Sequence, residues 1–409
     1  MLSVSEARES ILAVFQPLET TTLPLAIATG RVLAEDVVAG MDLPPFDNSS
    51  VDGFAVRAAD IRQASPDSPW TLKIVADIRA GDYASLPVQP GQAARIMTGA
   101  ALPPGAEAVV MVEDTDFNVR APGTPAPLRV TIKKAVQIGE NVRHHGDDLH
   151  AGHKVLMAGT RLRAQEIGLL AMLGMAEVLA YRQPKVALLS SGDELLPVEA
   201  PLPPGKIHDA NSYILASLVE SAGAQVLHLG VAADTEADVR SRLERAVMEK
   251  ADVILSSAGV SVGAFDYVKS IVEENGELDF WKVNMRPGKP LAFGKYHGIR
   301  FFGLPGNPVS AFVGFLVFVR PALEKLSGRE PSSGLRRSVR LGEAVESDGR
   351  ESYLRAIVKE TNGELTARLT GHQGSGNIFS LVQANALLIL PSGVKSLPAN
   401  SEVEAWLLE

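Results

Sequence analysis

The chain has 409 residues, of which 46% are hydrophobic and 21% are charged, so it is long enough for two to four soluble domains. Its formal net charge of −9 excludes a general nucleic-acid or membrane-surface binder, because both of these partners are polyanions. The sequence contains no cysteine, which excludes disulfides, thiolate metal sites and a cysteine nucleophile.

The N-terminal segment predicts an amphipathic helix over residues 3–15. Ser3 and Glu6 have the spacing of a capping box. One face of this helix carries the apolar residues Val4, Ala7, Ile11 and Val14. Charged residues interrupt the stretch, so it lacks the apolar core of a signal peptide. We therefore expect a cytoplasmic protein.

Short strand patterns broken by glycine and proline follow, and they predict a β domain over residues 42–151. Three of these patterns cover residues 71–78, 108–114 and 128–136. A second helical pattern lies beyond them at residues 164–173. We expect the β domain to be inserted into a discontinuous helical stem made of residues 1–41 and 152–181.

Strand and helix patterns alternate through residues 182–328 and predict a doubly wound α/β domain with a parallel sheet. The predicted strands cover residues 185–191, 224–231, 253–255, 291–296 and 299–306. The predicted helices cover residues 211–223 and 236–250, and further helices begin after Asp266 and at Pro308. The longest apolar run, residues 311–319, is too short for a bilayer core of ~30 Å and predicts a buried helix.

Alternating segments after Gly328 predict a small C-terminal β barrel over residues 329–409. The segments cover residues 337–345, 353–360, 364–370, 386–392 and 402–408.

Polar residues gather where the predicted strands of the α/β domain end. Asp193 and Glu194 follow the first strand, Asp234 follows the second, and residues 257–266 follow the third. Ligands of such folds bind beyond the carboxyl ends of the strands, so we expect the site there. The glycine loop with Gly259 and Gly263 has the features of an anion cradle, although a tight turn alone would also require glycine.

The segment "RPGKPLAFG" at residues 286–294 places Arg286 and Lys289 in a turn that two prolines stiffen, with Lys282 just upstream. This arrangement favours an anion site, but a simple surface turn is an alternative. "GLPGNPVSA" at residues 303–311 opens a helix, and capping by Asn307 explains much of that motif without a function.

In the β domain, an Asx turn that ends at Gly53 accounts for Asp47, whereas Asp52 and Thr98 are candidates for a site. "RHHGDDLHAGH" at residues 143–153 matches no zinc-ligand spacing, so we reject zinc and favour a polar loop in which only Asp148 matters. Taken alone, Arg355 and the turn "GHQGSGNIF" indicate only a structural role and no function.

Taken together, seven motifs resemble one family, the molybdopterin molybdenumtransferases, which include the E domain of gephyrin. The motifs are "PPFDNSSVDGFAV", "RIMTGA", "SSGDEL", "SSAGVSVGAFDYVK", "FWKVNMRPGKPLAFG", "GLPGNPVSA" and "GHQGSGNIF". They occur in the family's order across all the predicted domains. The family fold consists of a helical stem, an inserted β domain, a doubly wound α/β domain and a C-terminal β barrel.

The resemblance implies an enzyme that inserts molybdate into adenylyl-molybdopterin and releases AMP in a Mg²⁺-dependent step. It also implies a homodimer in which the β domain of one chain completes the site of the other. A molybdopterin adenylyltransferase would be the upstream donor, and neither nucleic acid nor a membrane is an expected partner.

The same resemblance assigns residues to roles. The implied metal ligands are Asp234, Asp266 and Glu194, and the implied phosphate loop contains Ser257, Gly259, Ser261 and Gly263. The implied molybdate site consists of Arg286, Lys289, Pro290, Arg355 and Ser375. Lys282 would meet the pterin phosphate or the anhydride, and Asp52, Thr98 and Asp148 would complete the site from the partner chain. Arg286 stands where the family often has lysine, which keeps the charge but replaces a point charge by a planar fork.

Two other functions are alternatives. A molybdopterin adenylyltransferase has a similar central domain, but it lacks the other domains and the "RPGKP" turn. A non-catalytic scaffold of the gephyrin kind would not need the acidic residues Asp234 and Asp266, which are both present here.

Overall fold

The computed structural model describes residues 1–83, 86–117, 124–257 and 265–408, although not the side chains of Phe265, Asp266 and Phe280. The chain forms two compact units. The first unit contains Met1–Glu35, Ala158–Ala171 and Met175–Glu409, and the second contains Asp36–Met157 and Met172–Gly174. The second unit encloses the range 42–151 predicted for the inserted β domain.

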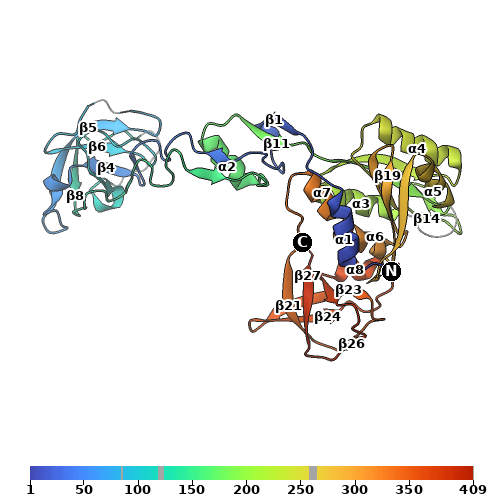
Figure 1. Ribbon diagram of the computed structural model, residues 1–409. Helices are drawn as coiled ribbons and strands as arrows, with labels where there is room; N and C mark the ends of the chain where they lie inside the picture. Colours follow the sequence, from blue (N-terminus) through green and yellow to red (C-terminus); the bar gives the residue numbers. More distant parts are fainter. Residues whose placement is uncertain (84–85, 118–123, 258–264, 409) are drawn as a thin grey trace. The chain divides into compact units, whose positions relative to one another are not determined.

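The second unit is built on a five-stranded sheet with the order β7-β4-β6-β5-β8 (Figure 1). The sheet contains β4 (Gly53–Val56), β5 (Trp70–Ile78), β6 (Gln92–Ile96), β7 (Ala108–Met111) and β8 (Arg129–Ile132). Two further pairs are β2 (Val37–Val38) with β10 (Lys154–Leu156) and β3 (Asn48–Ser49) with β9 (Val142–Arg143). Short 3₁₀ helices cover Ala58–Ile61 and Val112–Asp114. The first residue of β4 must be glycine, because a Cβ at Gly53 would lie 2.0 Å from Val110 O on the neighbouring strand.

The stem portion of the first unit consists of one strand pair and one helix. Strand β1 (Thr20–Pro24) pairs antiparallel with β11 (Glu177–Tyr181), and helix α2 covers Ala164–Met172. A 3₁₀ turn, Leu25–Ile27, follows β1.

A six-stranded sheet with the order β15-β12-β16-β20-β19-β17 forms the centre of the first unit. Its strands are β12 (Lys185–Ser191), β15 (Gln225–Ala232), β16 (Val253–Ser257), β17 (Gly276–Lys282), β19 (Pro290–Tyr296) and β20 (Ile299–Leu304). The helices are α3 (Ala210–Ser221), α4 (Glu236–Met248), α5 (Phe265–Glu274), α6 (Pro308–Gly314) and α7 (Arg320–Leu326), with a π-helical segment, Phe315–Val319, between the last two. The short strands β13 (Leu195–Leu196) and β14 (Ile207–His208) pair outside the main sheet.

The prediction of a parallel sheet is wrong for one strand, β19. β15, β12, β16 and β20 are parallel, but β19 pairs antiparallel with β20 and with β17. The reason is the short connection at His297 and Gly298, since a parallel neighbour requires a crossover of a dozen or more residues.

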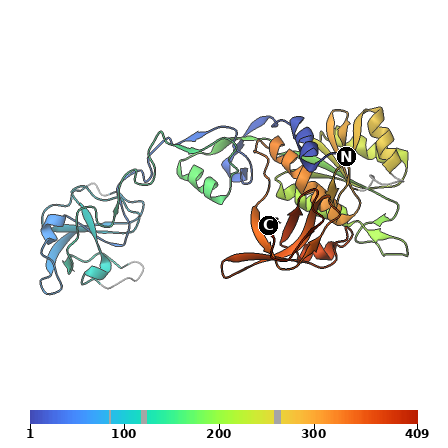
Figure 2. The same ribbon diagram turned by 60° about the horizontal axis from the view of Figure 1, so that its bottom comes forward.

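Helices cover both faces of this sheet, which confirms the doubly wound fold (Figure 2). Leu215 and Val219 of α3 pack on one face, and Val239 and Leu243 of α4 pack on the other. Helix α1 (Val4–Ala13) joins the first of these cores, although it lies within the range 1–41 predicted as stem. The predicted buried helix at residues 311–319 is also confirmed, because every residue from Ala311 to Val319 except Phe312 is buried.

The C-terminal strands form the predicted barrel. They are β21 (Arg336–Leu341), β23 (Glu351–Thr361), β24 (Glu364–Leu369), β25 (Ala386–Leu390) and β27 (Glu402–Leu407). Strands β22 (Val345–Glu346) and β26 (Ser396–Leu397) form a separate pair, and helix α8 covers Ile378–Gln383. The sheet runs β18-β23-β24-β21-β27-β25, and it closes because β23 also pairs with β25. The edge strand β18 (Met285–Arg286) comes from the α/β domain, so this pairing joins the two domains.

Three local predictions need correction. Helix α1 ends at Ala13, so Val14 is exposed and Phe15 is buried in its place. Asp47 does not form an Asx turn on its own loop, because its Oδ1 accepts a hydrogen bond from His145 N at 2.7 Å. Asn307 occupies the N-cap of α6 but its side chain makes no capping bond, since Val309 N donates to Ser375 O of the barrel instead.

Candidate functional site

Three carboxylates lie at the carboxyl edge of the parallel strands. Asp193 and Glu194 follow β12, and Asp234 follows its neighbour β15. Asp234 N donates a hydrogen bond to Asp193 Oδ1 at 3.2 Å. Gly192, which precedes them, has a φ of +147°, a backbone conformation that L side chains rarely adopt.

The surroundings of Asp234 disfavour its ionised form. Burial raises the pKa of its carboxyl group, and the charges of Asp193 and Glu194 raise this pKa further. Its Oδ1 atom is buried and has no hydrogen-bond partner among the described residues. A buried carboxylate oxygen without a partner requires an explanation, and a bound cation would supply one.

The third strand end holds Ser257, the last residue of β16. Its side chain is fully buried and its Oγ lies 2.8 Å from Ser190 Oγ of β12. The phosphate-loop residues Gly259, Ser261 and Gly263 lie outside the described residues. Asp266 falls in α5, but its side chain also lies outside the described part.

The turn between β17 and β19 carries the predicted cations. Arg286 is partly exposed, whereas Lys282 and Lys289 are exposed at the two ends of the turn. Pro290 begins β19 and pairs with Lys282 across the antiparallel ladder. Gly288 adopts a left-handed conformation (φ +95°), which an L side chain rarely adopts.

Arg355 comes from β23 of the barrel and is only 1% exposed. Its Nε donates to Ser380 Oγ at 3.0 Å and its Nη2 donates to Gly374 O at 2.9 Å. Burial lowers the pKa of Arg355 to about 10, and the nearby charge of Arg286 also contributes. Arg355 therefore holds the loop that contains Ser375 and brings a second positive charge close to the basic turn.

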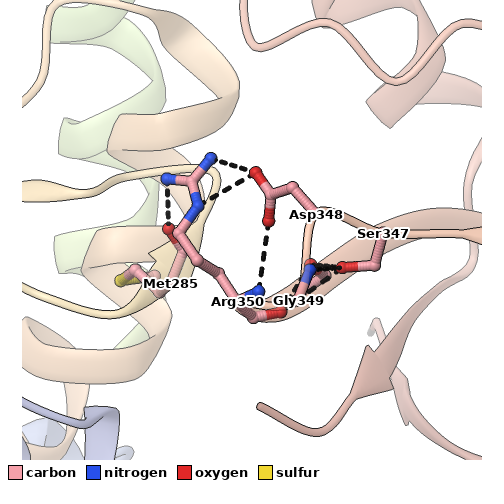
Figure 3. A network of polar contacts seen from close by, with 6 residues as sticks. Met285, Ser347, Asp348, Gly349 and Arg350 are labelled. Carbon is pink, nitrogen blue, oxygen red and sulfur yellow. Dashed lines mark hydrogen bonds and ion pairs between the residues drawn. The ribbon is translucent and has the colours of Figure 1, made fainter. Parts of the chain in front are cut away.

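A polar network joins the barrel to this turn (Figure 3). Arg350 donates to Met285 O at 3.0 Å and forms an ion pair with Asp348. Ser347 Oγ accepts a hydrogen bond from Gly349 N in the same loop. Arg350 holds the pKa of the Asp348 carboxyl below its ordinary value, with a smaller contribution from Arg286. The network fixes the backbone next to Arg286.

The second unit contains the remaining predicted residues. Thr98 donates to Asp52 Oδ1 through both its backbone N and its Oγ1, each at 2.8 Å. The fold thus brings Asp52 and Thr98 together at its surface. Asp148 is exposed on the loop whose histidines contact Asp42 and Asp47.

The sequence analysis gave no specific role to two residues of this edge. Asp193 binds the backbone of Asp234, and the "SSGDEL" motif that contains it was the available signal. Asn211 of α3 donates through Nδ2 to Gly306 O at 2.7 Å, while its buried Oδ1 finds no partner in the part of the chain that the structure describes. No local pattern distinguishes Asn211 from an ordinary residue at a helix start.

Within the described side chains, no group of three or more His, Cys, Asp or Glu residues is arranged to hold a metal ion. Likewise, the helices of the described residues include none with the length and apolar character needed to cross a membrane.

The fold and the site together define a class: a multidomain α/β protein with an acidic group at the carboxyl edge of a doubly wound sheet and a basic turn joined to a β barrel. Three families match successive regions of the chain. They are the MoeA N-terminal region (domain I and II) at residues 2–174, the probable molybdopterin binding domain at residues 187–325, and the MoeA C-terminal region (domain IV) at residues 338–408.

Similar proteins cover the whole chain. A molybdopterin molybdenumtransferase of Haemophilus influenzae is 37% identical over 397 residues, which are 95% of this chain and 94% of the relative. Molybdopterin molybdenumtransferase 2 of Mycobacterium tuberculosis is 38% identical over 413 residues and 99% of both chains. The crystal structure of a molybdopterin biosynthesis MoeA protein from Pyrococcus horikoshii has a TM-score of 0.77 and 31% identity, with 100% of both chains covered. The chain therefore belongs to the molybdopterin molybdenumtransferase (MoeA) family, and it is a transferase.

Proposed function

We propose that this transferase inserts molybdate into adenylyl-molybdopterin and releases AMP and the finished molybdenum cofactor. The observation that supports this most directly is the buried Oδ1 of Asp234, which has no hydrogen-bond partner among the described residues and lies in the carboxylate group with Asp193 and Glu194. Carboxylate oxygens are the protein ligands that Mg²⁺ accepts, so these residues fit the ion that the reaction requires.

Asp234, Glu194 and Asp266 would hold the Mg²⁺ ion. When bound, the ion would neutralise the charge of the two phosphoryl groups that flank the anhydride. Asp193 has a separate role, because its carboxylate accepts a hydrogen bond from Asp234 N and so fixes the backbone of that ligand.

Molybdate is a tetrahedral dianion and needs fixed positive charge. We assign Arg286, Lys289 and Pro290 of the basic turn to it, together with Arg355 and Ser375 of the barrel. A pKa of about 10 leaves Arg355 positively charged at neutral pH. Its Nη2 already binds Gly374 O beside Ser375, and its Nε binds Ser380 of α8, so Arg355 contributes its charge and orients that loop.

The remaining basic and glycine-rich elements are assigned to the phosphoryl groups. Lys282 would meet the pterin phosphate or the anhydride. The loop with Gly259, Ser261 and Gly263 would bind phosphate through its backbone N–H groups.

The decisive experiment supplies adenylyl-molybdopterin, molybdate and Mg²⁺ and measures released AMP together with protein-bound molybdenum. We expect both products to depend on molybdate and Mg²⁺, and we expect Asp266→Ala to abolish AMP release in a folded protein. Formation of adenylate from ATP and molybdopterin without molybdate would instead identify the chain as an adenylyltransferase. Unchanged AMP release by Asp266→Ala would refute the metal assignment.

The proposal includes a homodimer in which Asp52, Thr98 and Asp148 of one subunit complete the site of the other. The bond between Thr98 and Asp52 at the surface of their unit supports a preformed contact of this kind. Mixing Asp52→Ala chains with Asp266→Ala chains should restore part of the activity, because one mixed dimer site would be intact. No recovery would argue for self-contained sites. A molybdopterin adenylyltransferase as upstream donor and a cytoplasmic location remain parts of the proposal.

A further inference from the structure

A chain of four polar residues runs beneath the carboxyl edge of the sheet and ends at Ser257. Ser257 Oγ lies 2.8 Å from Ser190 Oγ, which lies 2.8 Å from Ser212 Oγ of α3. Ser212 Oγ donates to Asp209 Oδ2, and Ser212 N donates to Asp209 Oδ1 at 3.1 Å. Ser190 and Ser257 are fully buried and Asp209 is only 4% exposed.

The carboxylate at one end sets the direction of every hydrogen bond in this chain. A hydroxyl has one proton, and an ionised carboxylate only accepts. Because Ser212 gives its proton to Asp209, Ser190 must donate to Ser212, and Ser257 must in turn donate to Ser190. The Ser257 hydroxyl therefore has only its lone pairs left for any other group.

A second acceptor at this edge also lacks a partner. Asn211, next to Ser212 in the first turn of α3, is nine-tenths buried and uses its Nδ2 on Gly306 O. Its Oδ1 has no hydrogen-bond partner among the residues that the structure describes. Buried acceptors of this kind are normally satisfied, so this oxygen points to a ligand that carries a hydrogen-bond donor.

We propose that Asp209 is a positioning residue that makes the Ser257 hydroxyl a hydrogen-bond acceptor for an N–H or O–H group of the substrate. The inference rests on the proposed function, because that function supplies the substrate. It changes the role of the Ser257 side chain, which the family resemblance places in the phosphate loop. A phosphate oxygen is an acceptor and would meet lone pairs there, whereas amino and ring N–H groups of the adenine or pterin would be bound.

The substitution Asp209→Asn tests this role with little change in shape. Its amide oxygen must face Ser212 N to keep the helix cap, so its NH₂ group faces Ser212 Oγ. All hydroxyls of the chain then reverse, and Ser257 turns its proton toward the substrate. Asn caps a helix as well as Asp does, so we expect the thermal stability to change little.

The readout is the KM for adenylyl-molybdopterin in the AMP-release assay. Asp209→Asn should raise KM about tenfold and leave kcat nearly unchanged, because a donor replaces an acceptor opposite the substrate's donor. Ser257→Ala should raise KM by a smaller factor. In the Ser257→Ala background, Asp209→Asn should have no further effect on KM. Independent, multiplicative effects of the two substitutions would overturn the proposal.

Asp252→Asn is the matched control. Asp252 precedes β16 at the opposite end from Ser257, and it binds Lys185 N and Arg182. This variant should keep the KM of the wild type. Calorimetric binding of AMP and of inosine 5′-monophosphate separates the two sources of the donor. A loss of AMP preference in Asp209→Asn would identify the adenine amino group, and unchanged nucleotide binding with a raised KM would identify the pterin.

Neutron diffraction of the deuterated protein tests the hydrogen-bond direction without any enzymatic activity. The deuteron of Ser257 should lie between its Oγ and Ser190 Oγ. A deuteron of Ser190 directed at Ser257 would overturn the inference. If the wild type released no AMP, the proposed function would fail, whereas the neutron result would still decide the direction of the chain.

Discussion

At the scale of single residues, Asp234 combines a proposed role as a metal ligand with a cost to folding. Its pKa is raised in the folded state by burial and by Asp193 and Glu194. The stabilising contribution of a group with a raised pKa is fully present below the ordinary value of 3.8 and is lost as the pH rises through the folded-state pKa. At neutral pH, the charged form of Asp234 therefore opposes folding.

We predict that Asp234→Asn increases the free energy of unfolding at pH 7 without divalent ions, by no more than about 1 kcal/mol because the side chain is partly solvated. The increase should shrink as the pH falls toward 3.8, where the wild-type side chain also becomes neutral. Urea denaturation at several pH values checks this. Added Mg²⁺ should stabilise the wild type more than the variant. Equal stabilisation of both proteins would mean that Asp234 is not a ligand.

Arg355 stabilises the fold as well as the proposed molybdate site. We predict that Arg355→Ala lowers the free energy of unfolding by about 2–4 kcal/mol, because it leaves a cavity and removes hydrogen bonds to Ser380 and Gly374. The variant should also require more molybdate for AMP release. Arg355→Lys is the control, since it keeps the charge but not the forked geometry. An unchanged molybdate requirement in Arg355→Ala would contradict the assignment.

At the scale of secondary-structure elements, the antiparallel ladder of β17, β19 and β20 positions the basic turn. Lys282 and Pro290 form the last pair of the β17–β19 ladder, so the register of these strands decides where Arg286 lies. Gly294 permits this register, because a Cβ on it would lie 2.0 Å from Glu277 O.

We therefore predict that Gly294→Ala destabilises the protein by about 3 kcal/mol or more, because the strands must separate to admit the methyl group. Thermal unfolding of the variant measures this loss. Gly168→Ala in α2 is the control, since its Cβ would meet no atom within 4 Å. That variant should be neutral or more stable by up to ~1 kcal/mol, as expected for alanine in a helix. Equal melting temperatures of the two variants would contradict the register argument.

At the scale of the whole molecule, the two units have separate hydrophobic cores. The core of Asp36–Met157 contains Phe54, Ile61, Leu72 and Val130, all of which are fully buried within that unit. A domain with its own core can fold independently.

We predict that a fragment of residues 36–157 folds by itself with a cooperative thermal transition. The full chain should then unfold in more than one calorimetric transition, and one of these should match the fragment. Circular dichroism and calorimetry of both proteins check this. A disordered fragment would show that this unit depends on the rest of the chain.

Much of the fold could be predicted from local patterns. The capping box of Ser3 and Glu6, the buried faces of α3 and α4, and the alternation in the barrel strands all follow from spacings of a few residues. The polar ends of β12, β15 and β16 also predicted the edge where Asp193, Glu194, Asp234 and Ser257 lie. The roles of those residues remain proposals.

The type and order of these elements follow from local patterns, because apolar periodicity, caps and turn residues act over short distances along the chain. Only the tertiary structure decided the antiparallel direction of β19, the capping of α6 by Ser375 and the partners of Arg355. It also joined Ser257 to Asp209 through two intervening serines, and the proposed direction of the Ser257 hydroxyl rests on this chain. Contacts of this kind join residues far apart in the chain, and no local pattern of side chains specifies which of them will meet.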